Sequence, residues 1–168
     1  MTATAYAEWE QEYAAQAKPR ADIMAAEVTA SAEARKATEA MIESIGQAWL
    51  AEQILLWQKY WAAEPKDNIH RPKAAVFTQA KTDLTNAQKR AADQLVLANK
   101  AVAAAKTASS TADTAQNSAY AIADAAKTPR GRGLLHAQQS VQVAKASYAV
   151  AQAAAKATTK VPAVAKAI

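Results

Sequence analysis

The chain has 168 residues and a formal net charge of +5, and alanine supplies 49 residues, more than half of its 51% hydrophobic fraction. It contains no cysteine, only three glycines, and no run of about 18 apolar residues, so a disulfide scaffold, a collagen-like chain and a membrane span are excluded. Alanine has the best helix propensity, and glycine and β-branched residues are too few or too scattered for a sheet, so we expect an all-α protein. No charged segment followed by an apolar one opens the chain, and we expect any secretion signal to lie outside this segment.

Proline-rich breaks divide the chain into three long helical stretches. Two prolines fall within residues 64–72, a Thr-Pro-Arg-Gly-Arg-Gly turn occupies residues 128–133, and Pro19 predicts a kink in the first helix. The predicted helices are about 3–63, 73–127 and 134–160. At about 1.5 Å per residue the middle helix spans roughly 80 Å. Helices of this length joined by short loops are expected to fold back antiparallel, which predicts one elongated bundle or coiled coil over residues 1–168.

Small residues recur in steps of three and four along the second and third helices, a spacing typical of helices packed lengthwise. The predicted seam of the middle helix comprises Phe77, Ala80, Leu84, Ala87, Ala91, Ala98, Ala101, Ala105, Ala108, Ala112, Ala115, Ala119, Ile122 and Ala126. That of the last helix comprises Leu134, Ala137, Val141, Ala144, Tyr148, Ala151 and Ala155. Because alanine is small, we expect closely spaced helix axes.

Charge is distributed unevenly along the chain. Residues 1–64 hold ten acids and five bases (net −5), whereas residues 65–168 hold five acids and fifteen bases (net +10). One interpretation is that the acidic first helix lies against the basic later helices. The other is a basic surface for nucleic acid or anionic lipid in the C-terminal third. The candidate contacts for that surface are Arg130, Arg132, Lys145, Lys156 and Lys160.

No constellation of residues indicates catalysis. The two histidines, His70 and His136, each lie beside a predicted loop and lack metal-ligand spacing, so we interpret them as solvated. The Gly-Arg-Gly at 131–133 lacks the Lys-Ser/Thr pair and the preceding strand of a phosphate loop. We therefore expect no enzyme activity, cofactor or metal.

One aromatic-rich stretch differs from the alanine background, with three of the four tryptophans between residues 49 and 61. Its large apolar side chains cover well over half of a helix circumference, more than one packing face needs. One interpretation is that the bundle has most neighbours here, with the loop 65–72 folded over it. Another is a docking surface for a protein, and a third is insertion at a membrane surface. The candidate docking residues are Trp49, Leu50, Trp57, Tyr60 and Trp61.

Three segments carry a family resemblance: Gln47 to Trp61, Tyr120 to Leu134 and Gln138 to Val143. Together they resemble the alanine-rich helical region of large secreted actinobacterial proteins, the ALF-repeat proteins, which include umbrella-type polymorphic toxin particles. The similarity covers most of residues 20–160, without the ALF repeats or a toxin domain. It implies a coiled-coil stalk, a secreted location, and no catalytic residues to carry over.

Two functional hypotheses follow. The first is a non-catalytic structural and interaction module, a stalk or spacer in a secreted bacterial antagonism protein. Its partners are other proteins or covalent neighbours in a larger chain, and self-association is left open. The alternative is a basic helical protein, which could be cytoplasmic, that binds nucleic acid or anionic membrane through its C-terminal third.

Overall fold

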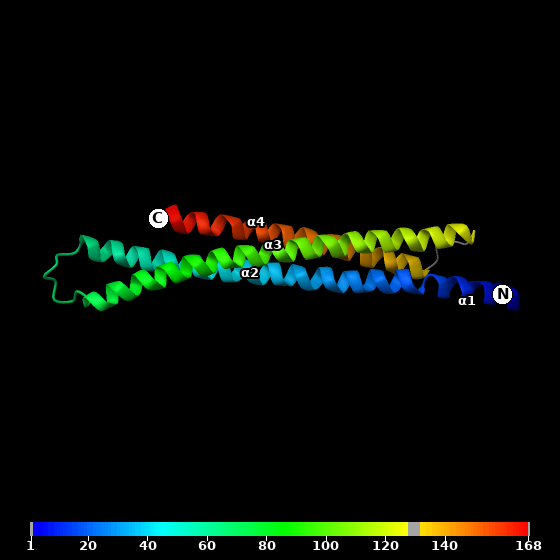
Figure 1. The fold of residues 1–168 in the computed structure, drawn as a ribbon, viewed down its shortest axis with the longest axis horizontal. Helices are drawn as coiled ribbons and strands as arrows, with labels where there is room; N and C mark the ends of the chain where they lie inside the picture. The colour runs from blue at the N-terminus through cyan, green and yellow to red at the C-terminus, as the bar shows by residue number, and fades with distance from the viewer. Residues whose placement is uncertain (1, 128–131, 168) are drawn as a thin grey trace. The chain divides into compact units, whose positions relative to one another are not determined.

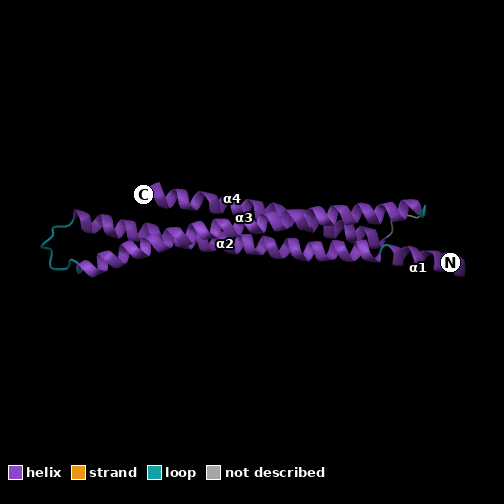
Figure 2. Cartoon of the chain, in the orientation of Figure 1, coloured by secondary structure: helices purple, strands orange, loops and turns teal. Residues whose placement is uncertain are grey.

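A computed structural model of the chain describes residues 2–127 and 132–167, and these residues form helices α1 (Ala3–Ala15), α2 (Ala17–Ala63), α3 (Ala74–Ala125) and α4 (Arg132–Ala167). The helices pack against one another, and no strand occurs among the described residues (Figures 1 and 2). The prediction of an all-α protein is confirmed. The described residues form four helices instead of about three, because the predicted kink near Pro19 is a break between α1 and α2.

The break between α1 and α2 lies at Gln16, one turn before Pro19. Proline has no amide hydrogen for the carbonyl four residues earlier, and its ring crowds that carbonyl, so the helix is interrupted at Ala15. The ladder resumes where the Arg20 amide donates to the Gln16 carbonyl at 3.1 Å. The Arg20 guanidinium spans the break, since it donates to the Tyr13 carbonyl and lies 3.5 Å from the centre of the Tyr13 ring.

The other helix ends differ from the predicted bounds by a few residues, most clearly at the C-terminus. The predicted end of the last helix at about residue 160 is wrong, because α4 continues through Pro162 to Ala167. A single proline removes one hydrogen bond from the ladder, which can continue on both sides of it. α3 ends at Ala125, and Lys127 has a left-handed backbone (φ 54°), the conformation that commonly stops a helix.

The described chain comprises two compact units, each with its own core. Unit 1 consists of Met1–Arg35 and Ala101–Ala151. One buried cluster of this unit comprises Ile23, Ala26, Ala30, Ala108, Ala112, Ala115, Ala137, Val141 and Ala144. Polar contacts join the helices at its edges: the Ser31 and Ser147 hydroxyls are 3.2 Å apart, and Lys145 pairs with Asp113 at 2.8 Å.

Unit 2 consists of Lys36–Lys100 and Gln152–Ile168. It contains the end of α2, the loop at residues 64–73 and the start of α3. One small cluster in this unit is made by Ala51 and Ala87, with Leu84 packed against it. Ser44 and Thr158 are also fully buried, and the Thr158 hydroxyl donates to the Ala154 carbonyl at 2.8 Å. Thus the largest fully buried side chains of this unit are small and polar.

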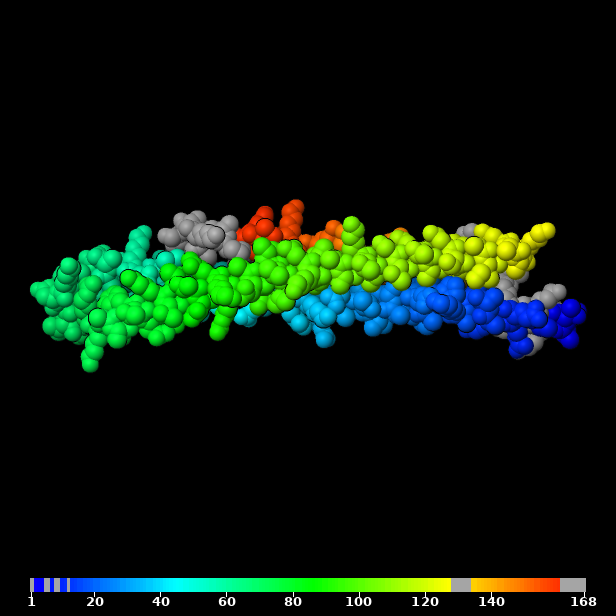
Figure 3. Space-filling view, in the orientation of Figure 1, coloured from blue at the N-terminus to red at the C-terminus, as the bar shows by residue number. Residues whose placement is uncertain are grey.

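Burial follows the predicted seam closely. Every α3 seam position from Ala87 to Ala119 is buried, as are all the α4 seam positions except Tyr148, which is half-buried. At the ends of the seam Phe77, Ala80, Leu84 and Ile122 are half-buried and Ala126 is exposed, because Ala123 takes the inward position near the end of α3. In the space-filling view the long side chains of α3 project singly from an otherwise smooth surface (Figure 3).

Candidate docking surface

The aromatic-rich stretch lies at the end of α2 in unit 2, and much of it faces solvent. Trp49 is 62% exposed and Tyr60 55%, while Leu50 is also exposed and Trp57 and Trp61 are half-buried. None of the residues from 52 to 86, all of which the structure describes, is buried. The interpretation that this stretch has the most neighbours in the bundle is therefore wrong.

The exposure has a structural cause within unit 2. α4 ends short of the loop at residues 64–73, so the last turns of α2 and the first turns of α3 have only each other (Figure 1). An aromatic contact joins them: the rings of Trp57 in α2 and Phe77 in α3 are 5.0 Å apart at 38°. Within α2, the rings of Tyr60 and Trp61 meet edge to face at 5.0 Å. Two helices cover only one side of each other, which leaves the remaining apolar side chains in water.

Arg71 fixes the loop to the end of α2. One guanidinium nitrogen donates to the Trp61 carbonyl at 2.9 Å and to the Glu64 carbonyl at 3.3 Å, two groups that have no partner inside the helix. The same guanidinium lies 5.2 Å from the centre of the Phe77 ring. Asn68 continues this fixation by donating to the Glu64 carboxylate at 2.9 Å. The loop therefore holds the aromatic end of α2 against the start of α3.

Sequence reasoning missed part of the exposed surface. Ile42 is 62% exposed and Ile45 49%, and with Leu56 they lie on the same side of α2 as Trp49 and Tyr60. The spacing of these residues in steps of three, four and seven was a signal for one helix face. The predicted docking surface was limited to the aromatic-rich stretch at residues 49–61, and the two isoleucines precede this stretch.

A groove of about 530 Å³ runs between α2 and α3 beside this surface. Its lining residues are Gln53, Ile54, Trp57, Val76, Gln79, Ala80 and Asp83. Gln79 donates to the Asp83 carboxylate at 2.8 Å, so the polar rim is partly satisfied within α3. The groove offers an apolar floor and few polar groups, which suits a protein side chain better than a charged ligand.

The predicted basic contacts are not brought together in one described site. Arg130 lies outside the described residues, and so does the Arg132 side chain. Lys145 is paired with Asp113 in unit 1, whereas Lys156 and Lys160 are exposed one turn apart in unit 2. Two neighbouring lysines make a small positive patch.

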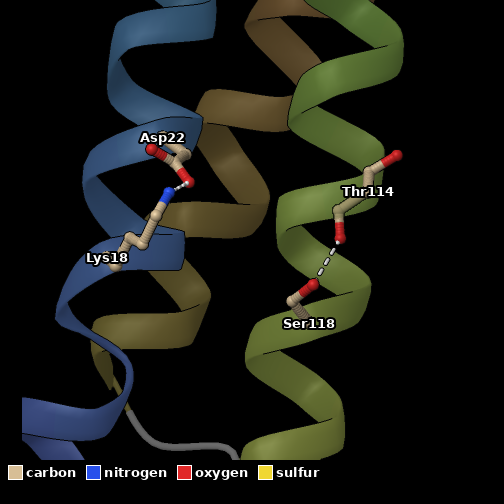
Figure 4. A network of polar contacts seen from close by, with 4 residues as sticks. All are labelled: Lys18, Asp22, Thr114 and Ser118. Atoms are coloured by element: carbon tan, nitrogen blue, oxygen red, sulfur yellow. Dashed lines mark hydrogen bonds and ion pairs between the residues drawn. The ribbon is translucent and has the colours of Figure 1, made fainter.

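A second groove, of about 980 Å³, lies in unit 1 between the start of α2 and α3. Lys18 and Asp22 pair on one side, and hydroxyl residues of α3 including Thr114 and Ser118 line the other (Figure 4). The Ser118 hydroxyl donates to the Thr114 carbonyl at 3.1 Å, so its hydrogen is used within the helix. A backbone carbonyl accepts this hydrogen, whereas a serine nucleophile is activated by donating its hydrogen to a base.

Among the described residues, the histidines and acids form no cluster of the kind that holds a metal ion. Both His70 and His136 are exposed, and His136 Nδ1 lies 3.3 Å from the Gln139 side-chain oxygen. No group of three or more potential ligands comes together among the described residues.

In the described part of the chain, no helix is both long and apolar enough to cross a membrane. Comparison with protein-family models, curated proteins and solved structures finds no match to this chain.

Proposed function

We propose that the chain is a non-catalytic structural and interaction module that docks a protein through the exposed end of α2. The observation that carries this proposal is the exposure of large apolar side chains on the last part of α2, Trp49 above all, next to a segment, residues 52 to 86, without a single buried residue. Apolar patches of this kind on folded proteins mark interaction sites, and tryptophan and tyrosine are common anchors.

The proposal includes a spacer role in an elongated antiparallel bundle or coiled coil. Its support is the length of the helices, 47 residues in α2 and 52 in α3, together with an alanine seam that lets helices lie close together. The resemblance to the stalk region of secreted ALF-repeat proteins agrees with this role, and it suggests a place in a bacterial antagonism system, outside the cell, next to covalent neighbours in a larger chain.

Small-angle X-ray scattering of the isolated chain tests the spacer role. We expect a radius of gyration well above the roughly 15 Å of a compact globule of this length. A value close to that of a globule contradicts the spacer role. A second test shortens α2, α3 and α4 by equal numbers of heptads: we expect folding to be retained and the function of the parent protein to be impaired.

The basic alternative is tested by the same protein in a binding assay. Binding to DNA or to anionic vesicles that falls steeply with added salt, and that is lost when Lys156 and Lys160 are changed to glutamine, supports the alternative. Hydrolytic or nuclease activity lost on a change at His70 or His136 contradicts the non-catalytic role.

A further inference from the structure

We infer that the exposed surface of α2 docks a second copy of this chain, with the two α2 helices antiparallel across a two-fold axis. This inference rests on the proposed docking role of the surface and names its occupant. The surface involved, called here the α2 stripe, consists of Ile42, Ile45, Trp49, Leu56 and Tyr60.

The α2 stripe is a continuous apolar face. Its members follow one another in steps of three, four, seven and four residues, so they return to the same side of a helix with 3.6 residues per turn. Each is exposed, from 47% at Leu56 to 62% at Trp49. Gln53 is the one residue that interrupts the face, at the position between Trp49 and Leu56.

The area of the α2 stripe suits a protein partner of its own size. At ordinary side-chain areas, the exposed fractions of the five residues amount to roughly 600 Å² on one copy. Two such faces in contact bury about 1,200 Å², at the lower end of specific protein interfaces. A self-complementary patch is also what a two-fold dimer requires, because both copies present the same residues.

Two charged residues flank the α2 stripe and fix the direction of pairing. Glu52 and Lys59 are seven residues apart, two helical turns, and lie on the same edge of the stripe. No side-chain hydrogen bond or ion pair among the described residues involves either of them. In an antiparallel pair related by a two-fold axis the same edges of the two helices meet. An axis between residues 55 and 56 therefore places each Glu52 opposite the second copy's Lys59.

The same register brings apolar residues together. Leu56 lies next to the axis and meets its own counterpart. Trp49 lies opposite position 62, within about 3 Å along the helix of the second copy's Tyr60. Ile42 and Ile45 of one copy extend toward the loop at residues 64–73 of the second copy, in which Ile69 is 90% exposed. A parallel pair in register leaves Glu52 and Lys59 unmatched, because it brings opposite edges together.

The charges near the stripe do not favour an anionic membrane as the occupant. Residues 36–64 carry four glutamates and two lysines, so the segment is repelled by negative headgroups. A second copy, in contrast, places its Lys59 opposite Glu52.

The test is a sedimentation series on the full chain from about 1 to about 300 µM, a range that covers the affinities expected of a small interface. We expect a monomer–dimer equilibrium that Trp49→Asp shifts to monomer. The matched control is Val28→Asp, because Val28 is 69% exposed on the same helix but lies outside the stripe. Far-ultraviolet circular dichroism verifies that each variant keeps its helix content.

Charge exchange distinguishes the antiparallel arrangement from any other. Glu52→Lys and Lys59→Glu each place like charges opposite one another, and we expect each to weaken dimerisation by about tenfold or more. The double variant restores the pairs in exchanged form and should regain most of that loss. Lys81→Glu, at an exposed position of α3, is the charge control.

Each outcome decides the inference. A chain that stays monomeric at every concentration, dimers unaffected by Trp49→Asp, or a double variant no stronger than the single ones overturns it. A monomeric chain whose scattering is that of an extended particle overturns the second copy alone and leaves the spacer role in place. A chain that dimerises as inferred but scatters as a compact globule contradicts the spacer role and leaves the second copy as the occupant of the α2 stripe.

Discussion

Replacing Ile23 by alanine is expected to be the most damaging conservative change in unit 1. Ile23 is fully buried in a cluster in which only it and Val141 are larger than alanine. The substitution removes three carbons, worth about 0.8 kcal/mol each in transfer free energy. The surrounding alanines have no side-chain freedom with which to fill the space, so a cavity penalty adds to this, and the free energy of unfolding should fall by about 3 kcal/mol.

Leu56→Ala is the matched comparison, because it removes the same number of carbons from the same helix. Leu56 is 47% exposed in a part of unit 2 without buried residues, so its loss should cost less than about 1 kcal/mol in the monomer. Differences in helix propensity among these residues are smaller than the contrast between the two sites, at a few tenths of a kcal/mol.

Urea titration followed by far-ultraviolet circular dichroism measures both changes. The protein is kept at the lowest usable concentration, so that association through the α2 stripe does not contribute. Equal costs at the two positions, or a cost below about 1 kcal/mol for Ile23→Ala, refute the assignment of stability to the few buried large side chains.

Four further changes test other parts of the structure. Ser44→Ala should stabilise the chain by about 1 kcal/mol, measured by urea titration, because the Ser44 hydroxyl is fully buried without a hydrogen-bond partner; a loss of stability shows that the hydroxyl is paired. Arg71→Ala should cost about 1–2 kcal/mol and increase amide exchange at the end of α2, since two carbonyls lose their donor; unchanged exchange contradicts the cap. Ala112→Leu should destabilise by about 1–3 kcal/mol, because a fully buried seam position has no room for three more carbons. A double-mutant cycle on Lys145 and Asp113, each side chain more than 40% exposed, should give a coupling of about 0.2–1 kcal/mol that weakens with salt, and a larger, salt-independent value contradicts this.

The seam was predictable from the sequence because its signal is local and repeated. Alanine at steps of three and four from Ala87 to Ala119 leaves little choice of which side of α3 faces inward. The loop at residues 64–73 was predictable for the same kind of reason, since two prolines cannot both be accommodated in a helix interior. Helix ends were less predictable: a helix breaks one turn before Pro19, whereas α4 is unbroken before Pro162, although both prolines interrupt the ladder in the same way.

The candidate site could be found from the sequence, but not its environment. Large apolar side chains of α2 cover most of its circumference near Trp57, and the sequence pattern does not indicate how many neighbouring helices are present there. That depends on where α4 ends relative to the loop. Arg71 could not be assigned either, because a cap formed ten residues along the chain from Trp61 depends on the path of the loop.

The placement of large and small side chains is the reverse of that in a typical monomeric domain. Ile23 and Val141 are fully buried and everything around them in their cluster is alanine, whereas Trp49 and Ile42 are each 62% exposed. Alanine contributes little transfer free energy per residue, so the core gains close packing at the expense of buried area. The large apolar area lies instead on the outside of α2, where burial requires a partner. Changes in the seam should therefore alter folding, and changes in the α2 stripe should alter association while folding is retained.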